Sequence, residues 1–210
     1  MPRILTPADI AGFRDRLCEV AARLFAEKGR EGFNMRDLAQ QVGVSAMTPY
    51  RYFEDKDEIL TVLKARAFGR LADQLEMANA LPGTPTDKGV AIGHAYCRFA
   101  LEEQTYYRLM FDLSQPGART SPELDRQEHR ARAAMMAHAQ LLVIATLQDG
   151  DPELIAEMLW STLHGAASLH LSGRLDAIGL DRLVRQTMMI HLMGYVAMPH
   201  DSAQEWRSVA

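Results

Sequence analysis

The sequence predicts an all-α fold of about nine helices. Apolar residues recur at three- and four-residue steps, capping residues stand directly before these runs, and continuous β-branched runs bounded by turns are missing. The chain has 210 residues, of which 48% are hydrophobic and 24% are charged. This composition is that of an ordinary folded globular protein, which buries a core.

The first two predicted helices are defined by their ends. Thr6-Pro7 places an N-cap before a proline at the first helical position, and Asp9 completes a capping box. That helix should end near Gly29. Asn34 caps a short second helix, which should end at Gly43.

A third short helix and a long fourth helix should follow. Ser45 is placed to cap a helix over residues 46–53. Asp55 with Glu58 begins the long helix, which should run to about Ala80. It carries one apolar stripe, formed by Ile59, Leu60, Leu63, Ala67, Leu71 and Leu75.

Five further helices are predicted in the rest of the chain. Two of them begin with the same pattern, a capping residue before a proline, at Ser121-Pro122 and at Asp151-Pro152. The expected ranges are 87–103, 105–113, 122 to near Gly150, 152 to near Gly173, and 181–198.

Residues 29–60 hold the most informative motif. A short helix, a turn and a second short helix follow one another here, which is the order of a helix-turn-helix. Gly43 can adopt the positive φ of a tight turn, and Val44 can fill the angle between the two helices. The second helix can then enter a DNA major groove.

Side chains on the outer face of this second helix suit DNA. Thr48 can hydrogen-bond a base edge or a phosphate, and Met47 can touch a thymine methyl group. Pro49 and Phe53 share the opposite face, which should pack on the preceding helix. The residues predicted to face DNA are Arg36, Ser45, Ala46, Met47, Thr48, Tyr50, Arg51, Tyr52 and Lys56. The alternative is that these tyrosines and basic residues only cover the surface of a small helical domain.

The segment from Ile10 to Leu63 resembles the TetR/AcrR family of bacterial transcriptional regulators, through the pattern LFAEKGREGFNMRDLAQQVGVSAMTPYRYFEDKDEIL. The resemblance implies a homodimer whose N-terminal heads bind DNA through Arg36, Ala46, Met47, Thr48, Tyr50, Tyr52 and Lys56. It also implies a C-terminal region that encloses a small molecule, whose binding changes the spacing of the heads. Pro49 departs from the family, which more often has an aliphatic residue there, so the orientation of the recognition helix is open.

The chain is expected to divide into two domains. Residues 1–55 form the predicted helix-turn-helix domain, with the start of a connecting helix at 56–80, and residues 81–210 form the ligand-binding and dimerisation domain. Residues 1–70 carry 12 Lys and Arg against 10 Asp and Glu, whereas residues 71–210 carry 11 against 17. The more basic N-terminal part suits contact with nucleic acid.

The last two predicted helices should form the dimer interface, because each is apolar around most of its circumference. Two such helices from each subunit would make an intermolecular four-helix bundle, which is also where the family dimerises. The expected interface residues are Leu163, Ala167, Leu171, Met189, Leu192 and Met193. Burial within a larger monomer core is the alternative.

Aromatic and methionine residues between the head and these two helices suit an apolar cavity. The residues predicted to line it are Phe99, Met110, Phe111, Met135, Trp160 and His164. His164 can orient a polar group of the ligand. The alternative is a plain hydrophobic core in which His164 is a satisfied core histidine.

Other functions have little support in the sequence. It lacks the GxSxG, GxxxxGK[ST], HExxH and strand-linked GxGxxG motifs, so we expect neither an enzyme nor a cofactor. Cys18 and Cys97 have neither metal-ligand spacing nor the pattern of a disulfide framework. No apolar stretch reaches the length of a membrane span and no secretory signal is recognisable, so a cytoplasmic protein without membrane contact is expected.

These features together predict a ligand-responsive transcriptional regulator. A homodimer would hold double-stranded operator DNA of palindromic sequence as a repressor, and a small apolar effector would release it. The alternative is a helical protein that binds or sequesters a small molecule and lacks specific DNA affinity, an alternative that Pro49 leaves open.

Overall fold

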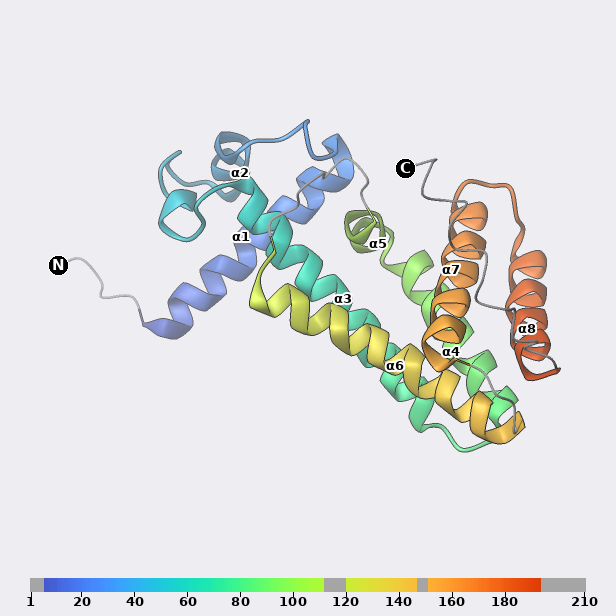
Figure 1. Ribbon diagram of the computed structural model, residues 1–210. Coiled ribbons are helices and arrows are strands. Elements are labelled where there is room, and N and C mark those ends of the chain that lie inside the picture. Colours follow the sequence, from blue (N-terminus) through green and yellow to red (C-terminus); the bar gives the residue numbers. More distant parts are fainter. Residues whose placement is uncertain (1–5, 112–119, 147–150, 194–210) are drawn as a thin grey trace, which may run out of the picture. The chain divides into compact units, whose positions relative to one another are not determined.

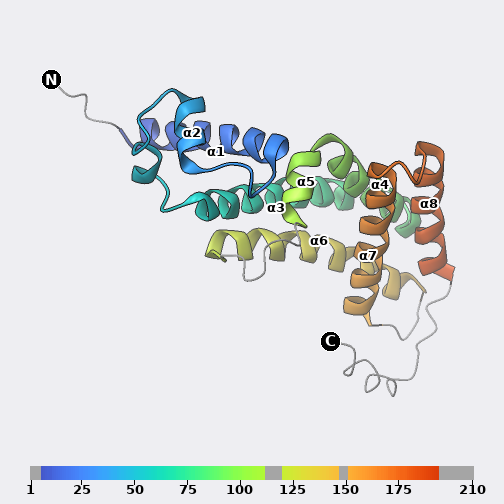
Figure 2. The same cartoon turned by 90° about the horizontal axis from the view of Figure 1, so that it is seen from above.

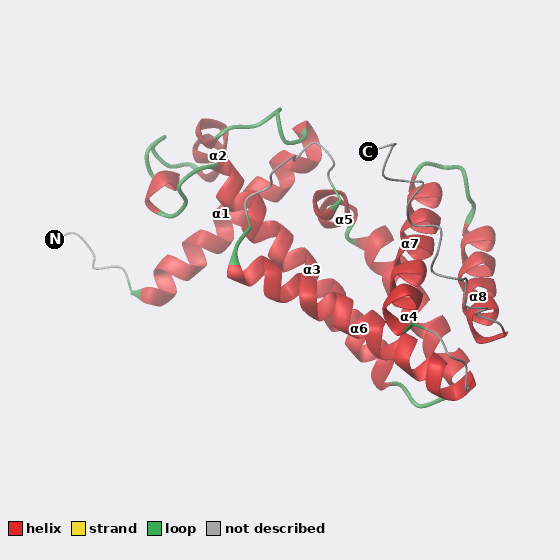
Figure 3. Cartoon of the chain, viewed as in Figure 1, coloured by secondary structure: helices red, strands yellow, loops and turns green. Residues whose placement is uncertain are grey.

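The computed structural model describes residues 6–111, 120–146 and 151–193 and, within them, all side chains but those of Thr146 and residues 191–193. In these ranges the chain is helical without any strand, which confirms the predicted all-α class (Figure 3). The elements, labelled in Figure 1, are α1 (Pro7–Lys28), α2 (Met35–Val42), the 3-10 helix η1 (Pro49–Arg51), α3 (Lys56–Ala80), α4 (Pro85–Glu102), α5 (Gln104–Met110), α6 (Pro122–Thr146), α7 (Pro152–Leu171) and α8 (Ala177–Met193). The nine predicted helices thus correspond to eight α-helices and one 3-10 helix in the described part of the chain.

Local caps fix the ends of α1 and α2 as predicted. Thr6 Oγ1 accepts a hydrogen bond from the Asp9 N–H at 3.1 Å, and the Asp9 carboxylate accepts one from the Thr6 N–H at 2.9 Å. The Asn34 side chain accepts two backbone N–H bonds at the start of α2. Gly29 and Gly43 follow the two helices with φ of 68° and 78°, a conformation that favours glycine.

The described residues form two compact units. The first comprises those of 1–74 and 98–132, and the second comprises those of 75–97 and 133–210. Helices α3, α4 and α6 contribute residues to both units. The functional boundary expected from the sequence, between residues 1–55 and 81–210, is a different division and stays a prediction.

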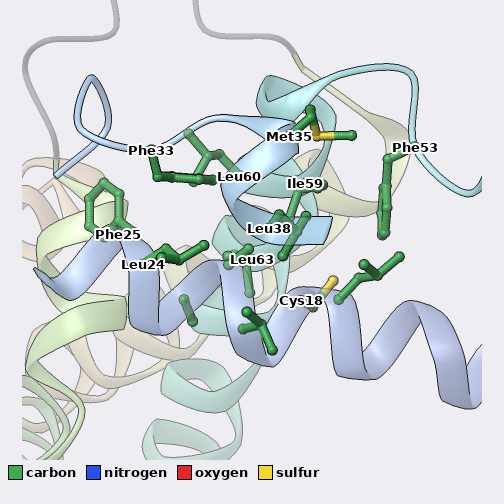
Figure 4. Packing of buried hydrophobic residues seen from close by; sticks show 14 of the residues in the cluster. Cys18, Leu24, Phe25, Phe33, Met35, Leu38, Phe53, Ile59, Leu60 and Leu63 are labelled. Atoms are coloured by element: carbon green, nitrogen blue, oxygen red, sulfur yellow. The ribbon is translucent and has the colours of Figure 1, made fainter. Parts of the chain in front are cut away.

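The core of the first unit lies where α1, α2 and the start of α3 meet (Figure 4). The first part of the predicted apolar stripe of α3, Ile59, Leu60 and Leu63, points into it, and Ile59 and Leu63 are completely buried. Other buried members are Leu17, Cys18, Leu24, Phe25, Phe33, Met35, Leu38, Phe53 and Leu60. This core holds α2 in place, since 8 residues are too few for a helix that is stable in isolation.

In the second unit, α7 and α8 pack side by side, as Figures 1 and 2 both show. Helix α4 approaches α8 closely at Gly93, where an added Cβ would lie 2.5 Å from Val184 Cγ1. At Gly89, one turn earlier, an added Cβ would lie 2.7 Å from Nε2 of His138 on α6. These two glycines therefore permit a close packing that a larger residue would prevent.

The start of α8 differs from the prediction. We expected the helix to begin at Asp181, but it begins at Ala177, because Asp176 Oδ1 accepts the Gly179 N–H at 2.6 Å and caps the helix earlier. Asp181 instead contacts His94 of α4, with 2.8 Å between its Oδ1 and the His94 Nε2.

The remaining helix ends lie within about two residues of the predicted ones where the structure describes them, except that α5 ends at Met110 and not at Leu113. Helices α4 to α7 begin within two residues of their predicted starts. The ends expected near Gly150 and Met198 lie outside the described residues. Among the helices described, none is both long and apolar enough to cross a lipid bilayer.

Candidate nucleic-acid interface

The second helix predicted for the helix-turn-helix, over residues 46–53, is a turn followed by η1. The backbone N–H groups of Thr48, Arg51 and Tyr52 bond to carbonyls three residues back, at distances between 2.9 and 3.1 Å. Pro49 has no N–H to donate, which removes one α-helical bond at the start of the segment. The predicted α-helix is therefore wrong in type. We call residues 45–53 the recognition segment.

Ser45 does not cap a helix. Its Oγ lies 2.8 Å from Thr48 Oγ1, so the two hydroxyls share one hydrogen bond. The predicted N-cap role of Ser45 is wrong, because its hydroxyl pairs with a side chain and not with a backbone N–H.

The recognition segment turns one set of side chains outward and another inward. Met47 is 69% exposed, Tyr50 is 49% exposed, and Arg51 is exposed as well. Pro49 and Phe53 are buried, and the Phe53 ring is directed toward α1 (Figure 4). These exposures agree with the two faces expected from the sequence, except that Thr48, also expected on the outer face, is half-buried. DNA contact by the outward residues stays a prediction.

Neighbouring elements supply further residues of the predicted set. Arg36 is exposed in the first turn of α2, and Ala46 is exposed at the start of the turn. Lys56 is half-buried, because its Nζ donates a hydrogen bond to the Arg30 carbonyl at 2.8 Å and lies 3.9 Å from Glu31 Oε2. In this arrangement Lys56 links the loop before α2 to the start of α3.

Two neighbouring residues of α1 contact the end of the recognition segment. The ring centroids of Phe13 and Tyr52 lie 4.7 Å apart. Arg14 donates a hydrogen bond to the Tyr52 carbonyl, and its guanidinium carbon lies 4.1 Å from the Phe53 ring centroid. Its Nη2 also lies 3.6 Å from Glu58 Oε1. Arg14 was not predictable from the sequence as part of this site, because 38 positions separate it from Tyr52 and no local pattern joins them.

The six residues predicted to line a ligand cavity fall in two different units. Phe99 and Met110 are buried in the first unit. Phe111, in the same unit, has its ring centroid 5.1 Å from that of Tyr107. The second unit contains Met135, Trp160 and His164.

His164 has a polar neighbour inside the second unit. Its Nδ1 lies 3.5 Å from the hydroxyl of the completely buried Tyr96, whose ring stands edge to face with that of Trp160 at 6.0 Å. Burial lowers the pKa of His164 below its ordinary value, so the imidazole is neutral at pH 7. Tyr96 is absent from the predicted lining residues and belongs with them in this cluster.

Two surface hollows lie in the first unit. One, of about 550 Å³, is lined by the end of α1, the residues directly after it and α5, including Phe25, Arg30 and Arg108. The other, of about 470 Å³, lies along α3 and the start of α6. Neither hollow is lined by any of the six predicted ligand residues.

The residues predicted for the dimer interface differ in exposure. Leu163 and Ala167 are buried inside their own unit, so they cannot contact a partner subunit in this conformation. Met189 is 39% exposed and Leu171 is half-buried. The side chains of Leu192 and Met193 lie outside the described residues.

The described side chains include no group of three or more His, Cys, Asp or Glu residues that could hold a metal ion. Cys18 and Cys97 are buried thiols that form no disulfide. Burial raises the pKa of Cys97 to about 11, which leaves little of the reactive thiolate at neutral pH.

Both parts of the chain match family models. Residues 17–63 match the model described as bacterial regulatory proteins, tetR family. Residues 90–200 match the model described as tetracyclin repressor-like, C-terminal domain. The second match alone covers more than half of the 210-residue chain.

Curated relatives are transcriptional regulators. The chain is 26% identical over 110 residues to the HTH-type transcriptional regulator Rv1816 of Mycobacterium tuberculosis. This match covers 51% of this chain and 47% of the relative. The chain is also 30% identical over 118 residues to the HTH-type transcriptional repressor KstR2 of Mycolicibacterium smegmatis. That match covers 52% of this chain and 57% of the relative. The chain thus spans about half the length of these relatives. Their names describe regulators and not enzymes, in agreement with the expectation from the sequence.

Solved structures share the fold. A protein of unknown function from a Rhodococcus species aligns with a TM-score of 0.75 and 27% identity, over 88% of this chain and 95% of that one. The TetR family transcriptional regulator PfmR from Thermus thermophilus aligns with a TM-score of 0.66 and 24% identity, over 87% of this chain and 100% of that one. The likeness to PfmR shows a common fold.

Proposed function

The chain belongs to the tetR family of bacterial regulatory proteins, and we propose that it is a homodimeric transcriptional repressor that responds to a small apolar molecule. The observation that carries this proposal is the recognition segment, whose Met47, Tyr50 and Arg51 side chains project from a well-packed helical head. Exposed apolar and aromatic side chains that gather on a rigid support commonly mark a binding surface. Binding to a bacterial chromosome would require the protein to act in the cytoplasm.

The proposed DNA contacts divide into base contacts and phosphate contacts. Met47 and Thr48 suit base edges, because an apolar side chain can contact a thymine methyl group and a hydroxyl can donate or accept a hydrogen bond. Tyr50 and Arg51 suit phosphate oxygens. Lys56 can reach a phosphate and keep its bond to the loop carbonyl, because an ammonium group has three N–H donors. The remaining proposed contacts are Arg36, Ser45, Ala46 and Tyr52.

The proposed dimer interface is the exposed apolar side of α7 and α8. Exposed large apolar side chains on these helices are Leu154, Met158, Leu169, Ile178, Leu183, Met189 and Ile190. Such a surface on two adjacent helices suits a four-helix bundle between two subunits. A twofold dimer would set its two recognition segments about 34–36 Å apart, which is one turn of DNA, and would therefore favour a palindromic operator.

The proposed repressor blocks transcription when it is bound to DNA, and an effector releases it from the DNA. The relative KstR2 is named a transcriptional repressor, which supports repression as the sign of regulation. The cluster of Tyr96, Trp160 and His164 offers a phenol and a neutral imidazole to one polar group of an otherwise apolar molecule. An effector that prefers a conformation with displaced heads would lower DNA affinity by the difference between its binding energies for the two states. Met135, in the same unit as this cluster, is a further proposed lining residue.

A helical sequestering protein without specific DNA affinity is the second candidate function. The shortening of the recognition segment at Pro49 favours it, because a single turn of 3-10 helix offers fewer side chains to a groove than an α-helix does.

A gel-shift titration with DNA from the promoter region beside the gene separates the two functions. The repressor is expected to give a specific shift that weakens as salt is raised, because phosphate contacts release counterions. Tyr50→Ala should weaken the shift, whereas Met77→Ala, exposed on α3 outside the recognition segment, should not. No specific shift on any promoter fragment would favour sequestration.

A further inference from the structure

Arg14 of α1 contacts three residues in two other parts of the DNA-binding head. It donates a hydrogen bond to the carbonyl of Tyr52, directly after η1. Its guanidinium carbon lies 4.1 Å from the ring centroid of Phe53. Its Nη2 lies 3.6 Å from Oε1 of Glu58 on α3. One side chain therefore links α1, the recognition segment and α3.

Glu58 and Phe13 extend this link. The second carboxylate oxygen of Glu58, Oε2, accepts the N–H of Glu54 at 2.6 Å, which ties the residues between η1 and α3 to the same group. Phe13, next to Arg14 in the chain, packs its ring against that of Tyr52 at 4.7 Å. Both the backbone and the side chain of Tyr52 are thus held from α1.

The recognition segment needs support of this kind. Its helical part, Pro49–Arg51, has only 3 residues, and the hydrogen bonds of a 3-10 helix have poorer geometry than those of an α-helix. Local bonds alone therefore orient the segment weakly. A guanidinium, with five N–H donors in one plane, can bond a carbonyl at a helix end and pair with a carboxylate at the same time.

We propose that Arg14 is a positioning residue for DNA recognition, which orients the recognition segment and so sets the discrimination between operator and other sequences. This inference rests on the proposed DNA-binding function. Contacts to base edges depend on how the segment is oriented, and they carry the sequence information. Contacts to phosphate supply most of the non-specific affinity and depend mainly on charge. Loss of the Arg14 contacts should therefore reduce specificity more than general DNA affinity.

A substitution that keeps the charge isolates this geometric role. In Arg14→Lys the ammonium group cannot reproduce the planar set of contacts. The matched control is Arg16→Lys, because Arg16 is exposed on the same helix and lies over the Phe13 ring at 5.1 Å. Full-length wild type, both variants and the charge-removing variant Arg14→Gln are titrated with operator DNA and with unrelated DNA of equal length, over a range of salt concentrations. Thermal unfolding reports whether each variant is folded.

For Arg14→Lys we expect operator affinity to fall about tenfold, roughly the cost of one mismatched base pair, while affinity for unrelated DNA stays unchanged. Arg16→Lys should change neither affinity. Equal losses on both DNAs, or a salt slope that falls by about one in Arg14→Gln, would identify Arg14 as a phosphate contact and overturn the inference. An unchanged ratio of the two affinities would also overturn it.

Hydrogen exchange of the free protein distinguishes failure of this inference from failure of the proposed function. Arg14→Lys should raise amide exchange at residues 51–53 about tenfold, with unchanged exchange in the buried part of α1, because the segment loses a support and the core does not. If wild type binds no operator but Arg14→Lys still raises amide exchange at residues 51–53, the proposed function fails while the role of Arg14 in orienting the segment stands. If exchange does not respond, the inference fails whatever the DNA titration shows.

Discussion

The hydroxyl oxygens of Ser45 and Thr48 lie 2.8 Å apart, so the residue that opens the recognition segment is hydrogen-bonded to the residue that precedes Pro49. In such a pair one hydroxyl donates to the other, and the second keeps its proton for a different acceptor. Ser45 therefore influences whether Thr48 donates to a base edge or accepts from it. We expect this pair, and not a helix cap, to determine how Thr48 reads a base.

Thr48→Val, which removes the hydroxyl and keeps the shape of the side chain, should change base preference at one operator position. The expected loss of discrimination there is about 1 kcal/mol, the net value of one hydrogen bond, with little effect at other positions. Competition binding with a library of single-base operator variants measures it. Ser45→Ala should alter the same position to a smaller extent. An equal loss at every position would contradict a base contact by Thr48.

Lys56→Ala should affect both stability and DNA binding. The hydrogen bond to the Arg30 carbonyl is lost, which should cost about 1 kcal/mol of the free energy of unfolding. One phosphate contact is lost as well, so the salt slope should fall by about one. Urea unfolding and DNA titration measure the two effects.

Lys28→Ala is the control for this change, because the ion pair of Lys28 with Asp37 is exposed and should contribute about 0–1 kcal/mol. A Lys56→Ala variant with unchanged stability and unchanged salt slope would remove Lys56 from both roles.

Gly93→Ala should destabilise the protein, because the added Cβ would lie 2.5 Å from Val184 Cγ1 and 3.4 Å from Leu163 Cδ2. Overpacking of this kind costs about 1–3 kcal/mol. Gly12→Ala provides the opposite case, since nothing lies within 4 Å of its added Cβ and an exposed helical Gly→Ala change stabilises by about 0.5–1 kcal/mol. Denaturant midpoints compare the two. Equal effects of the same sign would contradict the close packing of α4 on α8.

Met189→Glu should convert the proposed dimer to a monomer, because a charge in an apolar interface is left without a partner. Sedimentation velocity at a fixed protein concentration measures the change. Met77→Glu is the control, since Met77 is 63% exposed on α3 and lies outside the proposed interface. A dimer that persists in Met189→Glu would place the subunit contact elsewhere.

The pH dependence of stability should respond to His164. Burial lowers the pKa of this histidine, so the unfolded chain binds its proton more readily than the folded protein does. The contribution to stability is therefore full above the ordinary pKa of about 6.5 and is lost as the pH falls through the lower folded value. His164→Gln should flatten the decline in unfolding midpoint between about pH 7 and pH 5. A decline as steep as that of wild type would assign the effect to other groups.

Helix ends that depend on neighbouring residues were predictable from the sequence. Thr6 with Asp9, and Asn34 at the start of α2, act within four residues, and the structure has them as expected. Two local choices were not predictable. The Ser45 hydroxyl can bond a backbone N–H or the Thr48 hydroxyl, and Asp176 and Asp181 are both suitable caps for α8. Sequence alone does not decide which partner lies closer.

Contacts between distant residues set the rest of the candidate site. Arg14 and Tyr52 meet only because α1 and α3 share a core. Leu163 is buried because α4 passes close to α7 at Gly93, a contact that periodicity within α7 does not reveal. An apolar helix can therefore be recognised from its sequence, but which of its faces remains exposed depends on the fold.

DNA recognition by the exposed segment is tested by a footprint of wild-type protein on the promoter region beside its gene, repeated with the double variant Tyr50→Ala and Arg51→Ala. We expect two protected half-sites whose centres lie about one helical turn of DNA apart, and loss of both in the variant. Protection that is identical in wild type and variant would contradict DNA recognition by the exposed segment of residues 45–53.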